Sequence, residues 1–305
     1  MLSVLLDNIL PIFIVVTLGF LLRRRLQVDK RSLSSVVFNG LSPCLVFSAL
    51  INSGLSGAEF SELFLFTVAL VAVMGTLAFL VGRFLRYPRP LLIALMLTVM
   101  FANSGNFGLT LVELRYGGAG LARGIVYYVT STILVYTVGV FLATLRTAPD
   151  WRLALRRLTR IPAVYATGAA IVVFTTGLQL PGPLLRGVEI AGGGAIPVML
   201  IILGANLADL GGWADVGSSL RLALPGSLLR LLVAPLVGLG LTVLLGIEGQ
   251  GRAVAVIDAA LPTAVITTIL ATEFDVEPAA VTGMVVLSTL LSPVTVSFVI
   301  SALNL

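Results

Sequence analysis

Histidine is absent from this chain of 305 residues, and Cys44 is its only cysteine. The chain therefore lacks the usual proton relay, the usual zinc ligand and the imidazole base of a Ser–His protease. A single cysteine can build neither a disulfide framework nor a thiolate metal site within one chain. We therefore expect neither a bound metal nor a cofactor.

Charged residues are also scarce, at 11% of the sequence, whereas hydrophobic residues make up 58% and the mean hydropathy is +1.10. One soluble core cannot bury so much apolar surface, so lipid must cover the remainder. Soluble enzyme classes do not fit this composition, and we expect the protein not to be an enzyme. It predicts an all-α polytopic membrane protein, because apolar runs long enough to span a bilayer follow one another nearly end to end.

About ten spans are predicted from the apolar runs and the polar breaks between them. The first run is predicted to be a span rather than a signal peptide, because no basic region precedes it and no small-residue cleavage pattern follows it. The predicted spans cover residues 2–22, 33–52, 62–84, 91–115, 122–145, 161–180, 184–207, 220–247, 252–274 and 278–303.

The net charge of +5 comes from basic residues that cluster in the breaks between spans. This distribution argues against a nucleic-acid partner and for the lipid bilayer. By the positive-inside rule, the odd breaks are cytoplasmic and both termini lie outside the cell membrane. The clusters are Arg23, Arg24, Arg25, Lys30 and Arg31 in the first break, Arg83, Arg86 and Arg89 in the third, and Arg146, Arg152, Arg156, Arg157 and Arg160 in the fifth.

The longest polar stretch, residues 146–160, falls near the middle of the chain. Five spans on each side of it give the two halves opposite orientations in the membrane, which is the arrangement of inverted-topology repeats. We therefore predict a first five-helix repeat at 1–148, a cytoplasmic linker at 149–160 and a second, inverted five-helix repeat at 161–305. Short sequence matches that recur in the same order in both halves support this division.

The fourth and ninth predicted spans are both interrupted near their middle. The fourth contains the polar, glycine-rich run NSGNFG at 103–108, and the ninth contains Asp258 one turn before Pro262. Non-helical backbone persists at membrane depth only where it is buried in protein or lines a wet cavity, and proline removes a backbone donor. Two such broken helices would point four half-helix ends at a shared centre, where N-terminal ends present free N–H groups to an anion.

These interruptions predict a carboxylate site near the bilayer midplane, held mostly by amides and helix dipoles. In the alternative interpretation, Asn103 and Asn106 only join helices through hydrogen bonds, and the glycines allow close packing. Pro43 interrupts the second span, where it either shapes the pocket or only kinks the helix. The candidate substrate-binding residues are Asn103, Ser104, Gly105, Asn106, Pro262, Thr263 and Pro43.

Asp258 is the only acidic residue well inside a predicted span, and Arg230 lies about nine residues into the eighth. Charges at membrane depth are costly and usually functional, so Asp258 is a candidate for binding a coupling proton or sodium ion. Arg230 is a candidate charge partner of Asp258 or of an anionic substrate. The alternatives are a structural ion pair for Asp258 and snorkelling to the headgroups for Arg230.

Four segments carry a family resemblance: NSGNFGLTL at 103–111, LGANL at 203–207, RLLVAP at 230–235, and 256–293 with IDAALPTAV and LSP. Together they resemble the auxin efflux carrier family, which includes the plant PIN carriers and bacterial relatives. The resemblance covers most of the chain, and the combination is far more specific than any one motif. The chain is most similar to the bacterial type, because it lacks the long cytoplasmic loop of many plant members.

The resemblance implies ten spans in two inverted five-helix repeats, with crossed broken helices four and nine and elevator-like motion of a transport domain against a scaffold. It identifies Asn103 as the crossover asparagine, Pro262 as the crossover proline and Pro43 as the proline of the second helix. It also implies a homodimer and a small carboxylate substrate, auxin-like or a dicarboxylate such as malate. Two positions depart from the family: Thr110 replaces a usual proline, and Asp258 stands where plant carriers commonly have glutamine.

We interpret the chain as a secondary transporter of small organic anions, driven by proton or sodium coupling or by facilitated diffusion. One alternative is a sodium- or proton-coupled antiporter or symporter of another substrate class, although antiporters of that type typically rely on paired carboxylates. A non-transporting membrane receptor is the other alternative. An intramembrane protease would need a Ser–His pair or two facing aspartates, which this sequence does not offer.

Overall fold

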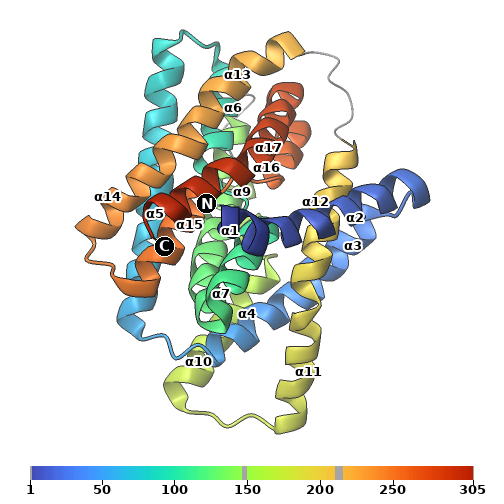
Figure 1. Cartoon of the computed structure of the whole chain (residues 1–305), viewed down its shortest axis with the longest axis vertical. Coiled ribbons are helices and arrows are strands. Elements are labelled where there is room, and N and C mark those ends of the chain that lie inside the picture. The colour runs from blue at the N-terminus through green and yellow to red at the C-terminus, as the bar shows by residue number, and fades with distance from the viewer. Residues whose placement is uncertain (1, 146–149, 210–215, 305) are drawn as a thin grey trace.

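The computed structural model describes residues 2–145, 150–209 and 216–304, and these residues fold into helices without a strand (Figure 1). Five of the segments are π-helical, with i→i+5 hydrogen bonds: η1 (Leu5–Ile9), η2 (Val37–Leu41), η3 (Ser104–Gly108), η4 (Val135–Gly139) and η5 (Leu229–Val233). The α-helices are α1 (Leu2–Val4), α2 (Leu10–Leu26), α3 (Lys30–Val36), α4 (Ser42–Ile51), α5 (Gly57–Phe84), α6 (Arg89–Met100), α7 (Leu109–Leu134), α8 (Val140–Thr144), α9 (Trp151–Leu158), α10 (Pro162–Thr176), α11 (Gly182–Gly193), α12 (Ala195–Asp209), α13 (Val216–Leu228), α14 (Ala234–Leu244), α15 (Gly249–Ala260), α16 (Ile266–Glu273) and α17 (Pro278–Ala302).

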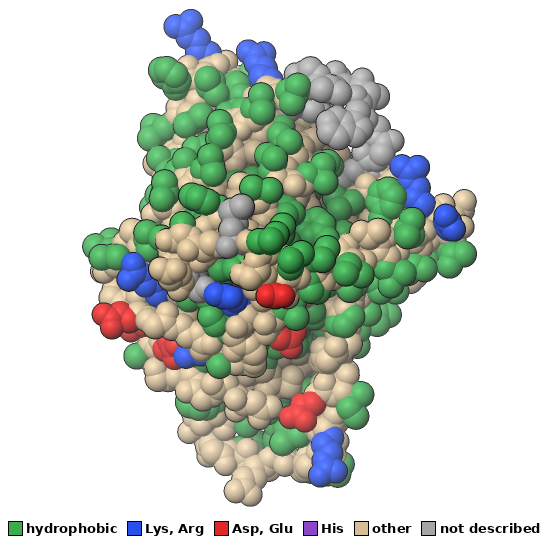
Figure 2. Space-filling view, in the orientation of Figure 1, with side chains coloured by type: hydrophobic (Ala, Val, Ile, Leu, Met, Phe, Trp, Pro, Cys, Tyr) green, Lys and Arg blue, Asp and Glu red, His purple; other side chains and the backbone are tan. Residues whose placement is uncertain are grey.

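Within the described residues, seven helical stretches are long and apolar enough to cross a membrane, or up to eight if the bent pair α9–α10 counts as one span. Hydrophobic side chains accordingly cover much of the molecular surface (Figure 2). The predicted all-α, multi-pass membrane protein is confirmed at this level. The predicted arrangement of ten helices in inverted repeats stays a prediction.

The number of long helical stretches is lower than the number of predicted spans, and two of the predicted spans show a local reason for the difference. The fourth is divided between α6 and α7, and the ninth between α15 and α16, so that α6, α15 and α16 are short. In addition, α7 continues into the fifth predicted span across a kink at Gly117. The backbone of Gly117 (φ 63°, ψ −155°) is non-helical, and this conformation is accessible to glycine but costly for other residues. The predicted repeat boundary at 148 lies outside the described residues, and the predicted linker 149–160 contains α9.

The helices pack as two bundles, which lie beside each other in Figure 1. The first bundle consists of α2, α3, η2, α4, α10, α11 and α12. The second bundle consists of α5 to α9 with η3 and η4, and of α13 to α17 with η5. Each bundle therefore combines elements from both halves of the sequence. Inside the first bundle, α2 and α12 approach so closely that a Cβ at Gly19 or Gly204 would collide with the backbone of the other helix.

Proline explains three of the π-helical segments. Pro11, Pro43 and Pro235 each stand two residues after a π-helical segment, and the residue directly before each proline donates its N–H to the carbonyl five residues earlier. The wider turn accommodates a ring that lacks an N–H and would crowd the carbonyl four residues back. The segment η3 has the same hydrogen bond, from Leu109 to the Ser104 carbonyl, but Thr110 occupies the proline position.

The turn between α2 and α3 is fixed by short polar contacts. Asp29 caps α3, and the Ser32 hydroxyl (2.6 Å) and the Arg31 N–H (3.0 Å) that donate to its carboxylate lower the pKa of this carboxyl. Asp209, the last residue of α12, pairs with Arg23 at 2.7 Å and with Lys30 at 2.6 Å. These contacts hold the ends of α2, α3 and α12 together.

Candidate functional site

The breaks in the fourth and ninth predicted spans lie against each other in the second bundle. The Asn103 N–H donates to the Pro262 carbonyl at 2.8 Å, and the Ala264 N–H donates to the Phe101 carbonyl at 2.9 Å. The residues between these pairs, Ala102 and Thr263, form an isolated antiparallel bridge. A broken helix leaves backbone groups without intrahelical partners, and here each break satisfies groups of the other.

Thr263 fixes one break to the helices behind it. It is fully buried, its N–H donates to the Ser288 hydroxyl at 3.2 Å, and its own hydroxyl donates to the Thr98 carbonyl at 3.0 Å. Neither Thr263 nor Pro262 lines the cavity that adjoins the breaks. The structure therefore gives these two predicted substrate-binding residues positions in the framework that supports the cavity.

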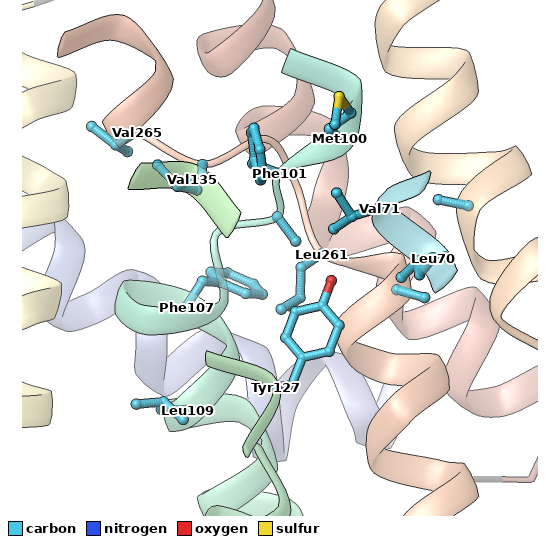
Figure 3. Close-up of a cluster of buried hydrophobic side chains, with 14 of the residues drawn as sticks. Leu70, Val71, Met100, Phe101, Phe107, Leu109, Tyr127, Val135, Leu261 and Val265 are labelled. Atoms are coloured by element: carbon cyan, nitrogen blue, oxygen red, sulfur yellow. The ribbon is translucent and has the colours of Figure 1, made fainter. Parts of the chain in front are cut away.

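Side chains around the breaks form a continuous apolar cluster (Figure 3). Phe101 and Leu261 come from the two breaks, Phe107 comes from η3, and Tyr127 comes from α7; all four are buried to within about 1%. Phe107 also contacts Phe13 of α2 edge-on, with ring centroids 6.0 Å apart. This packing surrounds one side of the non-helical backbone with buried apolar side chains.

A cavity of about 300 Å³ lies where the breaks face the first bundle. The first bundle contributes residues of α3, η2 and α12, including Phe38 and Asn206, and the second contributes residues of both breaks and of α7, η4 and α16. Four predicted substrate-binding residues line the cavity, whereas Pro43 does not, although it follows the π-helical segment that brings Val37 and Phe38 there. These four are Asn103, Ser104, Gly105 and Asn106.

Two half-helices begin at this cavity. The first N–H groups of a helix have no intrahelical partner, and they carry the positive end of its dipole. Gly105 and Asn106 stand in the first turn of η3, and Val265 and Ile266 stand at the start of α16; all four line the cavity. The arrangement therefore presents backbone donors from both broken helices to one small volume.

The Asn103 side chain adds a donor at the same place. Its amide nitrogen is buried and has no hydrogen-bond partner among the described residues, although the residue lines the cavity. A buried amide donor without a partner costs free energy, which a ligand that accepts a hydrogen bond would recover. Asn103 thus provides the kind of group that a carboxylate oxygen would satisfy.

The lining of the cavity is otherwise neutral. Among the described residues, none with a charged side chain lines it. Aromatic residues of η2, α7 and η4 contribute, together with aliphatic residues of α12 and α16. The aromatic lining residues are Phe38, Tyr128 and Tyr136.

Arg230 lies behind the breaks and is completely buried in η5. Its guanidinium donates to the carbonyls of Leu261 (2.9 Å), Ala259 (2.9 Å), Val99 (3.2 Å) and Asp258 (3.3 Å). These carbonyls belong to the C-terminal ends of α6 and α15, where the helix dipoles are negative. Arg230 therefore caps both half-helices that lead into the breaks, and it does not line the cavity.

Asp258 is buried in α15, with 1% of its surface exposed. Neither oxygen of its carboxyl group has a hydrogen-bond partner among the described residues. The Arg230 guanidinium donates to main-chain carbonyls, including that of Asp258, and not to this carboxyl group. A Cβ added at Gly108 would lie 2.9 Å from the Oδ1 atom of Asp258, so the close approach of η3 to this carboxyl needs a glycine. Asp258 does not line the cavity either.

The fifth predicted span supplies a lining face that the sequence prediction missed. Its residues follow the spacing i, i+3, i+4, i+7 and i+8, which places them on one side of a helix. Four of the five carry a hydroxyl group, and hydroxyl side chains with this period in an apolar span are a signal that could have been read from the sequence. The residues are Tyr128, Ser131, Thr132, Val135 and Tyr136.

Comparison with known proteins places the sequence in a family. A family model described as membrane transport protein matches residues 4–150 and 151–300. An uncharacterized transporter of Methanothermobacter thermautotrophicus is 28% identical over 294 residues, which cover 94% of each chain. An uncharacterized transporter of Methanocaldococcus jannaschii is 20% identical over 296 residues, again 94% of each chain. The chain belongs to the membrane transport protein family, which is the family of the auxin efflux carriers.

Proposed function

We propose that this membrane transporter is a secondary carrier of small organic anions. The substrate carboxylate binds in the cavity beside the two breaks, held by the backbone N–H groups that begin η3 and α16 and by the Asn103 amide. The observation that carries this proposal is the unpartnered amide donor of Asn103 beside two helix N-termini. Helix N-termini stabilise anions without placing a full positive charge in the site.

The neutral lining favours a monocarboxylate with an apolar body over a dicarboxylate. A second carboxylate would lose its hydration in a cavity whose described lining offers no basic side chain. An aromatic or branched aliphatic body would instead contact Phe38, Tyr128 and Tyr136. The volume of about 300 Å³ lies at the lower end of the range for small-molecule sites, which suits a small carboxylate.

Transport requires that the cavity open to each side of the membrane in turn. In our proposal, the second bundle moves against the first in an elevator-like manner, within a fold of ten helices in two inverted repeats with crossed broken helices. Two features support this mechanism: the cavity is lined by both bundles, and the breaks contact each other within one bundle. A rigid body that carries both breaks would move the substrate together with its donors.

Asp258 is our candidate for coupling transport to a proton or a sodium ion. Its carboxyl group is buried in the same bundle as the breaks and has no hydrogen-bond partner among the described residues. Such a group changes its charge or acquires a cation when its surroundings change. If Asp258 has this role, Asp258→Asn will transport without dependence on pH or sodium.

The decisive experiment measures substrate-induced currents. Purified protein in liposomes is tested by solid-supported-membrane electrophysiology with monocarboxylates and dicarboxylates, including indole and phenyl acids, at two pH values and with or without sodium. We expect saturable currents with monocarboxylates, and Asn103→Ala should raise the half-saturating concentration about tenfold to a hundredfold, because it removes a hydrogen bond to a charged group. The matched control is Asn39→Ala, an exposed asparagine outside the cavity.

Wild-type protein that is folded but silent across the panel would contradict a carrier of small carboxylates. Equal half-saturating concentrations for wild type and Asn103→Ala would show that the substrate binds elsewhere. Preference for dicarboxylates would overturn the argument from the neutral lining, while leaving the carrier function intact.

A further inference from the structure

Helix α9 is placed differently from the helices that span the membrane. It contains eight residues, which is far too short to cross a bilayer, and it is bent by 55° from α10, which follows it. The Asp150 carboxylate caps its N-terminus by accepting a hydrogen bond from the Leu153 N–H at 2.9 Å. A capped, amphipathic helix that leads obliquely into a spanning helix has the geometry of a helix in the membrane interface.

One side of α9 is fixed to the second bundle. Ala154 is buried, and the helix packs against η4 and α8. Arg157 forms an ion pair with Glu273 at the end of α16, and its guanidinium lies 5.3 Å from the ring centroid of Phe274. The orientation of α9 is therefore determined by the protein, and its remaining faces point outward.

The outward faces carry two kinds of side chain next to each other. Trp151 and Leu155 are exposed by 58% and 46% and stand four residues apart, so they share one side of the helix. Arg152 and Arg156 are also exposed and four residues apart, and Arg160 is exposed in the turn that follows. In the described parts of the chain, no acidic side chain forms an ion pair with any of these three arginines.

We propose that α9 is a binding surface for anionic phospholipids. Trp151 and Leu155 enter the boundary between headgroups and acyl chains, and Arg152, Arg156 and Arg160 bind lipid phosphates. Tryptophan favours this boundary because its ring is apolar and its N–H is polar, and the arginine fork matches phosphate geometry. Arg152 lies over the Trp151 ring, 6.0 Å from its centroid, so cation and apolar pair form one surface. Such a surface, without an acidic partner among the described residues, fits a lipid better than a soluble anion, which would leave Trp151 and Leu155 in water.

The position of α9 gives the bound lipid a mechanical connection to the site. Through Arg157 and Glu273, α9 is attached to the C-terminal end of α16, whose N-terminal end lines the cavity. The proposal that α9 binds anionic phospholipids does not rest on the proposed transport function. It can therefore be tested by a measurement of lipid contact alone.

Trp151 provides the reporter for this test. The other tryptophan of the chain is Trp213, so Trp213→Phe leaves Trp151 as the only one. The Trp213→Phe protein is reconstituted in two kinds of liposome made of phosphatidylcholine and phosphatidylglycerol. In one kind the phosphatidylcholine carries bromine near the headgroup end of its acyl chains, and in the other kind the phosphatidylglycerol does. Bromine quenches tryptophan at contact, so the ratio of quenching by the two brominated lipids, at equal mole fraction, reports the lipid preference at α9.

We expect several-fold stronger quenching by brominated phosphatidylglycerol, since each arginine near an anionic surface favours binding about fivefold. Replacing Arg152, Arg156 and Arg160 by glutamine should bring the ratio close to one. The matched control replaces Arg83, Arg86 and Arg89, three exposed arginines at the turn from α5 into α6, and should leave the ratio unchanged. Both variants change the net charge equally.

Equal quenching by the two lipids in the Trp213→Phe protein would overturn the proposal. The same loss of preference in the Arg83/Arg86/Arg89 control would also overturn it, because a general surface charge would then explain the effect. If the variant that lacks the α9 arginines does not fold, salt is varied with the Trp213→Phe protein, which keeps these arginines. Its preference for phosphatidylglycerol should then fall sharply as the salt concentration rises from about 0.1 M to about 1 M. A preference that does not respond to salt would contradict headgroup binding.

Discussion

Arg230 places a positive charge within hydrogen-bond distance of carbonyls at the C-terminal ends of two helices, α6 and α15. Broken helices end in carbonyls without intrahelical partners, and a buried carbonyl without a partner costs free energy. A guanidinium with five donors in a plane can serve several carbonyls at once. The side chain is thus explained by the backbone of the breaks.

This explanation predicts a large effect of Arg230 on stability. Arg230→Met has a similar length but no donor, and it should lower the free energy of unfolding by about 3 kcal/mol or more, because it leaves buried carbonyls unpaired. Arg230→Lys, which keeps the charge with three donors, should fall between this variant and wild type. Chemical unfolding in detergent measures the difference, with the exposed Arg83→Met as control. Equal stability of Arg230→Met and Arg83→Met would contradict the capping role.

At the scale of the element, the π-helical segments determine which side chains reach the cavity. A π turn inserts one additional residue into the helix, so that every later side chain rotates relative to the earlier ones. Residues of η2, η3 and η4 line the cavity, and η5 carries Arg230. In η1, η2 and η5 a proline two residues later accounts for the wide turn, whereas η3 adopts it with Thr110.

Thr110→Pro should therefore be tolerated, although it introduces proline into a helix. The backbone at Thr110 has the hydrogen-bond pattern that precedes Pro11, Pro43 and Pro235, and the buried Thr110 hydroxyl has no partner to lose among the described residues. We expect a change in unfolding free energy below about 1 kcal/mol, against a loss of about 3 kcal/mol for Val129→Pro in the regular part of α7. Thermal unfolding of both variants measures this difference, and similar losses would contradict the interpretation.

At the scale of the whole molecule, the site belongs to two bundles at once. The backbone donors lie on the second bundle, and part of the lining, including Phe38 and Asn206, lies on the first. Contacts between the bundles at the cavity include Phe38 with Tyr136, whose ring centroids are 6.3 Å apart, and the hydroxyls of Ser42 and Tyr128 at 3.2 Å. Such contacts can be exchanged without breaking either bundle, as relative motion of packed bodies requires.

If the bundles move against each other, substrate will change distances between them but not within them. In a Cys44→Ser background, spin labels at Arg25→Cys on α2 and Arg83→Cys on α5 report a distance between the two bundles. Labels at Arg25→Cys and Arg186→Cys on α11 report a distance within the first bundle. We expect a saturating carboxylate to shift the first distance distribution by more than about 2 Å, as in domain rearrangements, and to leave the second unchanged. Two unchanged distributions in protein that carries substrate current would exclude the moving-bundle mechanism.

The sequence by itself determined the class of the protein and the location of its interruptions. Few charges and successive apolar runs of about 20 residues indicate a helical membrane protein, because a helix of that length spans the bilayer and satisfies its own backbone hydrogen bonds. The run at 103–108 and Pro262 mark the breaks locally, since glycine, asparagine and proline weaken regular helix wherever they stand. The cavity adjoins these breaks, and four of the predicted substrate-binding residues, all in the run at 103–108, line it.

Only the tertiary structure decided what the groups around the breaks contact. Pro262 and Thr263 lie outside the cavity because the two breaks pair through their backbones, and Arg230 donates to carbonyls rather than to the carboxyl group of Asp258. The structure also decided which face of the fifth predicted span meets the cavity, where Tyr128 of α7 and Tyr136 of η4 line it. The pairing of the breaks and the role of Arg230 depend on contacts between separate segments, such as Asn103 with Pro262 and Arg230 with Val99, and such contacts leave no periodic pattern in a single sequence.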